Sequence, residues 1–144
     1  MNYISMTEKD LDIITSLYVK YYNENEDGYW TYEKAYKRIR QVFLTPDSLC
    51  LIQNNGNEYT GFLMGYIKEY DDLKSYMLEE IVIFKEFQNN GLGKLFIKKL
   101  EEQLLYKNVS LIELLSINDK KHDKFYGDLE FKNSSNLRIM SKFI

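Results

Sequence analysis

Residues 81–95 read IVIFKEFQNNGLGKL, and this stretch decides the fold. Its first four residues are an apolar run with β-branched side chains, which is typical of a short strand. A polar turn follows and leads into Gly91, Leu92 and Gly93. Leu92, Phe96 and Leu100 then recur at every fourth position, which predicts a helix. The stretch therefore predicts a strand, a glycine-containing turn and a helix start, in that order.

A turn of this kind can bind an anion. The first N–H groups of a helix have no partner within the helix, and the helix dipole adds partial positive charge there. Glycine lets a phosphate approach the backbone without meeting a Cβ. The pattern is not a Walker A loop, because no Gly-Lys-Ser/Thr follows, and Phe96 stands where a dinucleotide-binding motif has its third glycine. A helix that merely begins after a tight glycine turn remains the alternative.

The spacing Gln-x-x-Gly-x-Gly, at residues 88–93, resembles the acyl-CoA pyrophosphate loop of the GNAT superfamily of N-acetyltransferases. The resemblance implies that backbone N–H groups of this turn hold the pyrophosphate of acetyl-CoA. It also implies that residues 81–83 pair with the pantetheine arm as a further strand would. The implied cofactor-binding residues are Ile81, Val82, Ile83, Gln88, Asn89, Asn90, Gly91, Leu92, Gly93, Lys94, Asn118 and Phe125.

Length and charge exclude several classes of protein. At 144 residues we expect a single domain spanning residues 1–144. The net charge is −3 with both signs interspersed, which argues against a nucleic-acid binder with a broad basic face. No run approaches the ~20 apolar residues that cross a bilayer. The first residues show no secretory signal, so we expect a cytoplasmic protein with no membrane partner.

Cysteine and histidine usage predicts no metal site. The only cysteine, Cys50, lies in an apolar run and is expected to be a buried strand residue. The only histidine, His122, lies in a charged segment and is expected at the surface. One residue of each kind does not make a zinc site.

Hydrophobic periodicity and turn signals place the remaining elements. The expected strands are residues 3–6, 48–53, 58–69, 76–84, 109–117 and 137–143, and the expected helices are residues 8–22, 31–44, 92–106 and 118–126. The apolar run at 109–117 carries one acid, Glu113, and suits a central strand. These elements predict an α/β (α+β) domain with a mixed, mostly antiparallel central sheet of about six to seven strands flanked by about four helices. The same order is found in GNAT proteins, so the resemblance extends over nearly the whole chain.

Residues 125–131 read FYGDLEF and resemble the Phe-Tyr-x-x-x-Gly-Phe segment of the family. The resemblance implies that Tyr126 lies near the thioester sulfur. A phenol with a pKa of ~10 is protonated at neutral pH and can donate to a leaving thiolate. Glu130 stands in place of the family's glycine, so the turn departs from the pattern. Ordinary core packing of Phe125 and Tyr126 is the alternative.

The strand before the loop carries Glu79 and Glu80. Because strand side chains alternate, we expect one carboxylate to face the cleft and the other to point away. A carboxylate there could take a proton from the attacking ammonium, directly or through water. The resemblance favours Glu80, because one group of GNAT proteins has a glutamate at the matching position. A solvated strand carboxylate is the alternative.

The acceptor side is predicted less sharply. The acidic residues Glu24, Glu26 and Asp27, with Tyr29 and Trp30, could form an acidic, aromatic mouth suited to a cationic amine. Residues 30–35 also resemble the Trp-Thr-x-x-x-Ala start of a helix in one group of GNAT proteins. A solvated loop with Trp30 packed on that helix is the alternative.

Together these features predict an acetyl-CoA-dependent N-acetyltransferase that acts on a primary amine of a small, cationic acceptor. No metal and no covalent enzyme intermediate are expected. The rival hypotheses are a catalytically silent CoA-binding regulatory domain and an acyltransferase that uses a longer acyl-CoA. A paired C-terminal strand would allow a homodimer.

Overall fold

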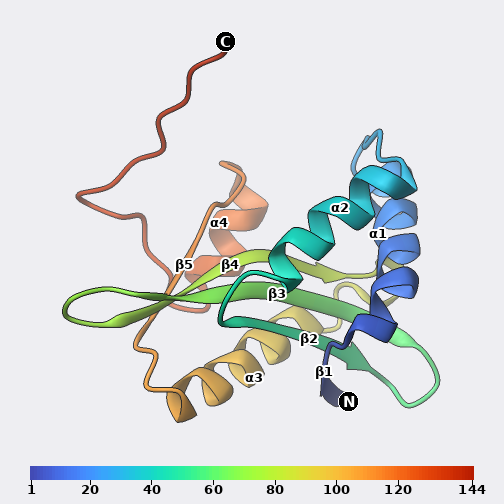
Figure 1. Cartoon of the computed structure of the whole chain (residues 1–144), viewed down its shortest axis with the longest axis horizontal. Helices are drawn as coiled ribbons and strands as arrows, with labels where there is room; N and C mark the ends of the chain where they lie inside the picture. The colour runs from blue at the N-terminus through green and yellow to red at the C-terminus, as the bar shows by residue number, and fades with distance from the viewer.

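A five-stranded sheet lies at the centre of the computed structural model, which describes all residues from 1 to 144 (Figure 1). The strands lie in sequence order: β1 (Asn2–Ser5), β2 (Ser48–Asn54), β3 (Tyr59–Glu69), β4 (Lys74–Ile83) and β5 (Leu111–Leu114). Neighbouring strands are antiparallel except β4 and β5, which are parallel. The parallel pair requires a long crossover, and the chain makes it through the helix that follows β4.

Helices cover both faces of this sheet. They are α1 (Leu11–Asn25), α2 (Tyr32–Phe43), α3 (Leu92–Tyr106) and α4 (Lys120–Gly127), with short 3-10 turns η1 (Glu8–Asp10) and η2 (Lys85–Phe87). Thr31 and Asp119 cap α2 and α4, because each side chain accepts a hydrogen bond from a backbone N–H three residues later. Figure 1 shows α1 and α2 on one side of the sheet and α3 on the other.

Two apolar cores follow from the alternation of strand side chains. Phe62, Met64 and Val82 pack against α1 and α2. Leu63 and Leu78 point to the opposite face and pack against α3. No helix of the structure combines the length and apolar character needed to cross a membrane.

The sheet opens at one end because β4 extends beyond the residues that pair with β5. The two strands pair only from Ser75 to Leu78, whereas β4 continues to Ile83. The register also shifts here. Met64 of β3 lies opposite Glu80, but the next residue lies opposite Leu78, so Glu79 is the extra residue of a β-bulge. Residues 79–83 therefore have a strand partner on one edge only.

The predicted fold class is confirmed, with fewer strands than expected. The helices and the first four strands lie close to their predicted bounds. The strand expected at 109–117 is shorter, at Leu111–Leu114, and it is an edge strand rather than a central one. The closing strand expected at 137–143 is wrong, because no strand of this chain pairs with that segment. An apolar alternation predicts a strand only where another strand supplies the hydrogen bonds.

Candidate active site

A cleft of about 440 Å³ opens where β4 and β5 diverge. Its walls are residues 81–83 of β4, the turn residues Gln88, Asn89 and 91–94, and Phe125 with Tyr126 of α4. The strand and the turn belong to the stretch 81–95, whereas Phe125 and Tyr126 were linked to it only through the family resemblance. The structure therefore brings most of the predicted cofactor-binding residues together around one space.

The turn before α3 presents a row of free backbone donors. The first backbone hydrogen bond of this helix runs from the Leu95 N–H to the Gly91 carbonyl at 3.1 Å. None of the N–H groups of residues 89–94 donates to a protein acceptor. The first turn of a helix leaves such groups unpaired, and a phosphate can accept from several of them at once.

Glycine is favoured at both positions of the Gly-x-Gly pattern. Gly91 has a φ of 74°, in the left-handed region that residues with a Cβ avoid. A Cβ on Gly93 would lie 3.0 Å from a ring carbon of Phe125. The first glycine therefore sets the path of the turn, and the second keeps α3 close to α4.

Other residues of the turn have different roles from those expected. The Gln88 side chain donates to the carbonyl of Ile83 at 2.8 Å and to the hydroxyl of Tyr21 at 3.0 Å, so it braces the turn. Asn90 is exposed, and its side chain donates to backbone carbonyls of the turn. Lys94 is paired with Asp128 at 2.7 Å, which offsets its charge at the cleft.

Asn118 does not join the cleft. It is exposed in the segment between β5 and α4, and it does not line the cleft wall. The predicted strand to which it was assigned ends early, at Leu114. The expected role of this residue therefore depended on a strand that is shorter than its apolar run.

Tyr126 lies in the cleft wall between two aromatic rings. Its ring meets that of Phe125 edge-on at 5.0 Å and that of Phe131 at 5.4 Å. Burial, together with the charge of Glu80, raises the pKa of the Tyr126 hydroxyl. The phenol is therefore protonated at neutral pH and can act as a proton donor.

The turn after Tyr126 forms despite the departure from the family motif. Glu130 takes a φ of 67°, the left-handed conformation that glycine adopts without strain. Its N–H donates to the carbonyl of Gly127 at 3.0 Å, and the Phe131 N–H donates to the carbonyl of Tyr126 at 3.0 Å. The backbone thus keeps the glycine-type turn with a glutamate in it.

Glu80 is held by two tyrosines of α1. One carboxylate oxygen accepts from the hydroxyl of Tyr18 at 3.2 Å and the other from the hydroxyl of Tyr22 at 2.9 Å. Burial raises the pKa of Glu80, although hydrogen bonds from both tyrosines and the charge of Arg38 act in the opposite direction. The side chain is 14% exposed and does not itself line the cleft, so a proton would reach it through water.

The expectation that Glu79 and Glu80 point to opposite sides is wrong. The guanidinium of Arg38, on α2, lies 2.9 Å from a Glu79 oxygen and 3.8 Å from a Glu80 oxygen. The β-bulge at Glu79 breaks the alternation of side chains, so both carboxylates meet the same arginine.

The residues expected to meet the acceptor do not line the cleft. Glu24 is exposed on α1, and Tyr29 is 96% exposed. Trp30 packs edge-on against Tyr18 at 5.2 Å, so its indole is part of the packing around α1.

Sequence reasoning missed several residues of the site. Tyr21, Phe87, Lys121 and His122 line the cleft, and Tyr18, Tyr22 and Arg38 surround Glu80. The only signal for the tyrosines was their helical spacing, which also fits core packing. Their role depends on hydrogen bonds to residues about 60 positions away in the chain.

The only cysteine is not one of the residues that line the cleft. Cys50 is buried in β2, and burial raises the pKa of its thiol to about 11. A thiol of that kind is a poor nucleophile at neutral pH. No three histidine, cysteine, aspartate or glutamate side chains are grouped as metal ligands.

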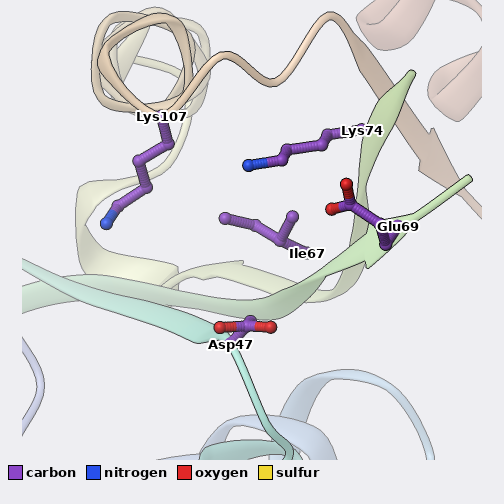
Figure 2. A pocket seen from close by; sticks show the side chains of 5 residues that line it. All are labelled: Asp47, Ile67, Glu69, Lys74 and Lys107. Carbon is purple, nitrogen blue, oxygen red and sulfur yellow. The ribbon is translucent and has the colours of Figure 1, made fainter. Parts of the chain in front are cut away.

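A second, smaller pocket of about 300 Å³ contains none of the predicted site residues. Figure 2 shows Lys74 and Lys107 around the same space as Asp47 and Glu69. The two positive and two negative side chains leave no net charge that would select an ion. The cleft beside β4 is therefore the better candidate for a functional site.

Comparison with known proteins identifies the family and the fold of the chain. A family model described as the acetyltransferase (GNAT) domain matches residues 18–143. A crystal structure described as a probable acetyltransferase superposes with a TM-score of 0.82 at 16% identity, covering 100% of this chain and 98% of that one.

Two further structures carry names that state an acceptor. A ribosomal-protein-alanine N-acetyltransferase from Brucella melitensis biovar Abortus 2308 has a TM-score of 0.77 at 11% identity, with 99% and 100% of the two chains covered. An aminoglycoside acetyltransferase from an uncultured soil metagenomic sample has a TM-score of 0.71 at 11% identity, with 99% and 98% covered. Similarity at this level establishes the fold, and the two names state different acceptors.

Proposed function

The chain belongs to the GNAT acetyltransferase family, and on that basis we propose that it transfers an acetyl group from acetyl-CoA directly to a primary amine. The observation that carries the proposal is the row of unpaired N–H groups at residues 89–94, at the mouth of the cleft beside β4. Backbone donors of this kind suit the pyrophosphate of the cofactor. The free edge of residues 81–83 suits its pantetheine arm, which can add to a strand edge.

In the proposed reaction the amine nitrogen forms a bond to the acetyl carbonyl carbon, and the bond from that carbon to sulfur breaks. The sulfur keeps the electron pair and takes a proton from the hydroxyl of Tyr126. The ammonium first loses one proton through water to Glu80 and attacks as the free amine. The second nitrogen proton is lost as the carbon–sulfur bond breaks, and it returns to the oxygen of Tyr126 through water. A carboxylate has about four acceptor positions, so hydrogen bonds from Tyr18 and Tyr22 leave room for that water.

We propose a small, cationic acceptor. Glu24, Glu26 and Asp27 follow the part of α1 that reaches the cleft at Tyr21. Exposed carboxylates near a cleft attract cations over a distance of about 10 Å at moderate salt. In this proposal Glu24 and Tyr29 act as an outer rim, and Trp30 supports the rim by packing on Tyr18.

Two measurements test the proposed function. Acetyl-CoA is expected to raise the melting temperature of the protein, because a ligand that binds only the folded state stabilises it. Release of free thiol in the presence of a panel of amines should then show turnover. Tyr126→Phe should lower kcat by about 100-fold or more, with the acetyl-CoA-induced shift in melting temperature retained.

The outcomes separate the proposal from its rivals. Binding without turnover of any amine would favour a regulatory domain that only senses CoA. The position of Glu80 behind the cleft wall would then explain why no amine is acetylated. Turnover with a longer acyl-CoA but not with acetyl-CoA would favour the second rival. The absence of any shift in melting temperature would refute the assignment of residues 88–94 as a cofactor loop.

A further inference from the structure

Gln53 places an amide where the pattern of β2 favours an apolar side chain. Leu49 and Leu51 of this strand point to the face of the sheet that packs against α3. Because strand side chains alternate, Gln53 points to the same face. Its side chain is fully buried, at 0% exposed. A buried amide costs free energy unless it is hydrogen-bonded, and a residue that breaks the local pattern in this way is a candidate for a functional role.

Both polar atoms of the Gln53 side chain are hydrogen-bonded. Its oxygen accepts from the hydroxyl of Thr60 at 2.8 Å. Its amino group donates to the carbonyl of Leu92 at 3.2 Å and to the hydroxyl of Tyr3 at 3.4 Å. Since a carbonyl can only accept, the bond to Leu92 fixes which end of the amide is the donor. The side chain therefore links β2 to α3 in a single orientation.

A β-bulge supplies the partner of the Gln53 oxygen. Gln53 lies opposite Gly61 of β3, whereas the next residue, Asn54, lies opposite Tyr59, so Thr60 is the extra residue. Thr60 is also 0% exposed. Bulges re-aim side chains, and this one turns the Thr60 hydroxyl to the amide in a part of the core that is otherwise apolar.

The bond from Gln53 meets α3 at its first residue, Leu92. No other side chain of the sheet is hydrogen-bonded to the first turn of this helix. The buried side chains of Phe96 and Ile97 also hold α3 on the sheet, but apolar contacts have no preferred direction. A hydrogen bond does have one, so it can fix where along the sheet the helix begins.

We propose that Gln53 is a positioning residue for the turn that binds acetyl-CoA. By holding the carbonyl of Leu92, it fixes the peptide groups beside that carbonyl, which belong to the row of free N–H groups at residues 89–94. Good N–H···O bonds vary in length by only about 0.5 Å, so a phosphate that accepts from several donors needs all of them in place. Donors that are ordered before binding cost less entropy, which strengthens binding. This role rests on the proposed function, because it takes residues 88–94 as the cofactor turn.

The double variant Gln53→Met, Thr60→Val tests the proposal by removing both partners of the buried bond. Met and Val have nearly the shapes of the residues they replace, and such an exchange is nearly neutral for stability. The melting temperature of the unliganded variant should therefore stay within about 3 °C of the wild type. The dissociation constant for acetyl-CoA, measured by titration calorimetry, should rise by about tenfold. For an amine that is acetylated, kcat at saturating acetyl-CoA should change by less than about twofold.

Thr60→Val alone is the matched control. It keeps the bond from Gln53 to Leu92 but leaves the buried oxygen of Gln53 without its donor. The melting temperature should fall by about 3 °C or more, because an unsatisfied buried acceptor is destabilising. The dissociation constant for acetyl-CoA should stay within about twofold of the wild type, since the turn is still held. A merely structural role could not produce this result, because affinity would then follow stability.

The outcomes distinguish the role of Gln53 from the proposed function. Normal acetyl-CoA affinity in the double variant would overturn the proposal, and so would a loss of affinity in Thr60→Val as large as in the double variant. If the double variant does not fold, Gln53→Met alone takes its place, with the same expected loss of affinity. A wild type that does not bind acetyl-CoA would refute the proposed function and this role together. A wild type that binds no better than Gln53→Met would count against Gln53 alone.

Discussion

Two regions of the candidate site are built from different parts of the chain. In the first, which we call the loop side, residues 88–94 present backbone N–H groups whose positions depend on local conformation. The second, which we call the tyrosine side, lies behind the cleft wall, where Tyr18, Tyr22, Arg38, Glu79 and Glu80 form a network of side chains from α1, α2 and β4.

This difference separates binding from proton transfer. Backbone donors are fixed by the turn and do not change charge with pH. The side-chain network contains a partly buried carboxylate, Glu80, whose protonation depends on its neighbours. We therefore expect changes on the loop side to weaken acetyl-CoA binding, and changes on the tyrosine side to affect turnover and its pH dependence.

The largest effect is expected on the tyrosine side. Glu80→Gln should lower kcat by about 100-fold, because the amide cannot take the proton that the carboxylate accepts. The acetyl-CoA-induced shift in melting temperature should be unchanged. The paired measurement is kcat from thiol release alongside a thermal melt with and without acetyl-CoA.

Glu79→Gln is the matched control for this substitution. Glu79 meets the same arginine but is the bulged residue and is more exposed. We expect it to change kcat by no more than about threefold, as for a partly exposed ion pair. Equal losses in the two variants would mean that the arginine pairing matters and the proton acceptor does not.

The next effect is expected on the loop side. Gly93→Val would push a side chain into the ring of Phe125, which lies 3.0 Å from the position of a Cβ. The displaced turn should weaken acetyl-CoA binding by about tenfold, or about 1.4 kcal/mol, with kcat at saturation largely kept. Titration calorimetry gives the affinity directly.

Gly127→Ala, at the end of α4, is the control for this substitution, because a Cβ there meets nothing within 4 Å. It should bind acetyl-CoA as the wild type does. If Gly93→Val binds normally, the close approach of α3 and α4 is not what shapes the cofactor loop.

The same difference explains what could be predicted from the sequence. The loop side was predicted well, because a strand, a glycine turn and a helix start are local features of residues 81–95. The bounds predicted for α3 match those observed, Leu92–Tyr106. The family resemblance then supplied Phe125 and Tyr126, which lie across the cleft from the loop.

The tyrosine side could not be predicted in the same way. The bulge at Glu79 depends on the register between β3 and β4, which no short pattern in the sequence reveals. The hydrogen bonds from Tyr18 and Tyr22 to Glu80 join residues that meet only in the folded chain. The missing closing strand has a similar cause, since a strand is defined by its partner and not by its own alternation.

A smaller effect at neutral pH is expected from Arg38→Met. The positive charge of Arg38 lowers the pKa of Glu80, while burial raises it. Without the arginine, the pKa of Glu80 rises further, and the carboxylate becomes protonated at a higher pH. The acid limb of the kcat/KM profile should therefore move to higher pH by about one unit.

Arg38→Lys tests whether charge is the cause of that shift. Lysine keeps the positive charge without the planar guanidinium, so most of the wild-type profile should return. A loss of activity that is uniform across pH in Arg38→Met would instead indicate a structural defect.

The smallest effect is expected at the outer rim of the acceptor side. Glu24 is exposed and makes no ion pair, so its charge acts only at a distance through water. Glu24→Gln should raise KM for a cationic amine by about twofold at low salt, and the difference should vanish as salt screens the charge. KM for a neutral acceptor should not change. An amine panel with no preference for cations in the wild type would remove the cationic acceptor from the proposal. A twofold, salt-dependent change in KM would instead support a role for the exposed rim in attracting the cationic acceptor. The proton transfer assigned to Glu80 lies deeper and is tested separately by Glu80→Gln.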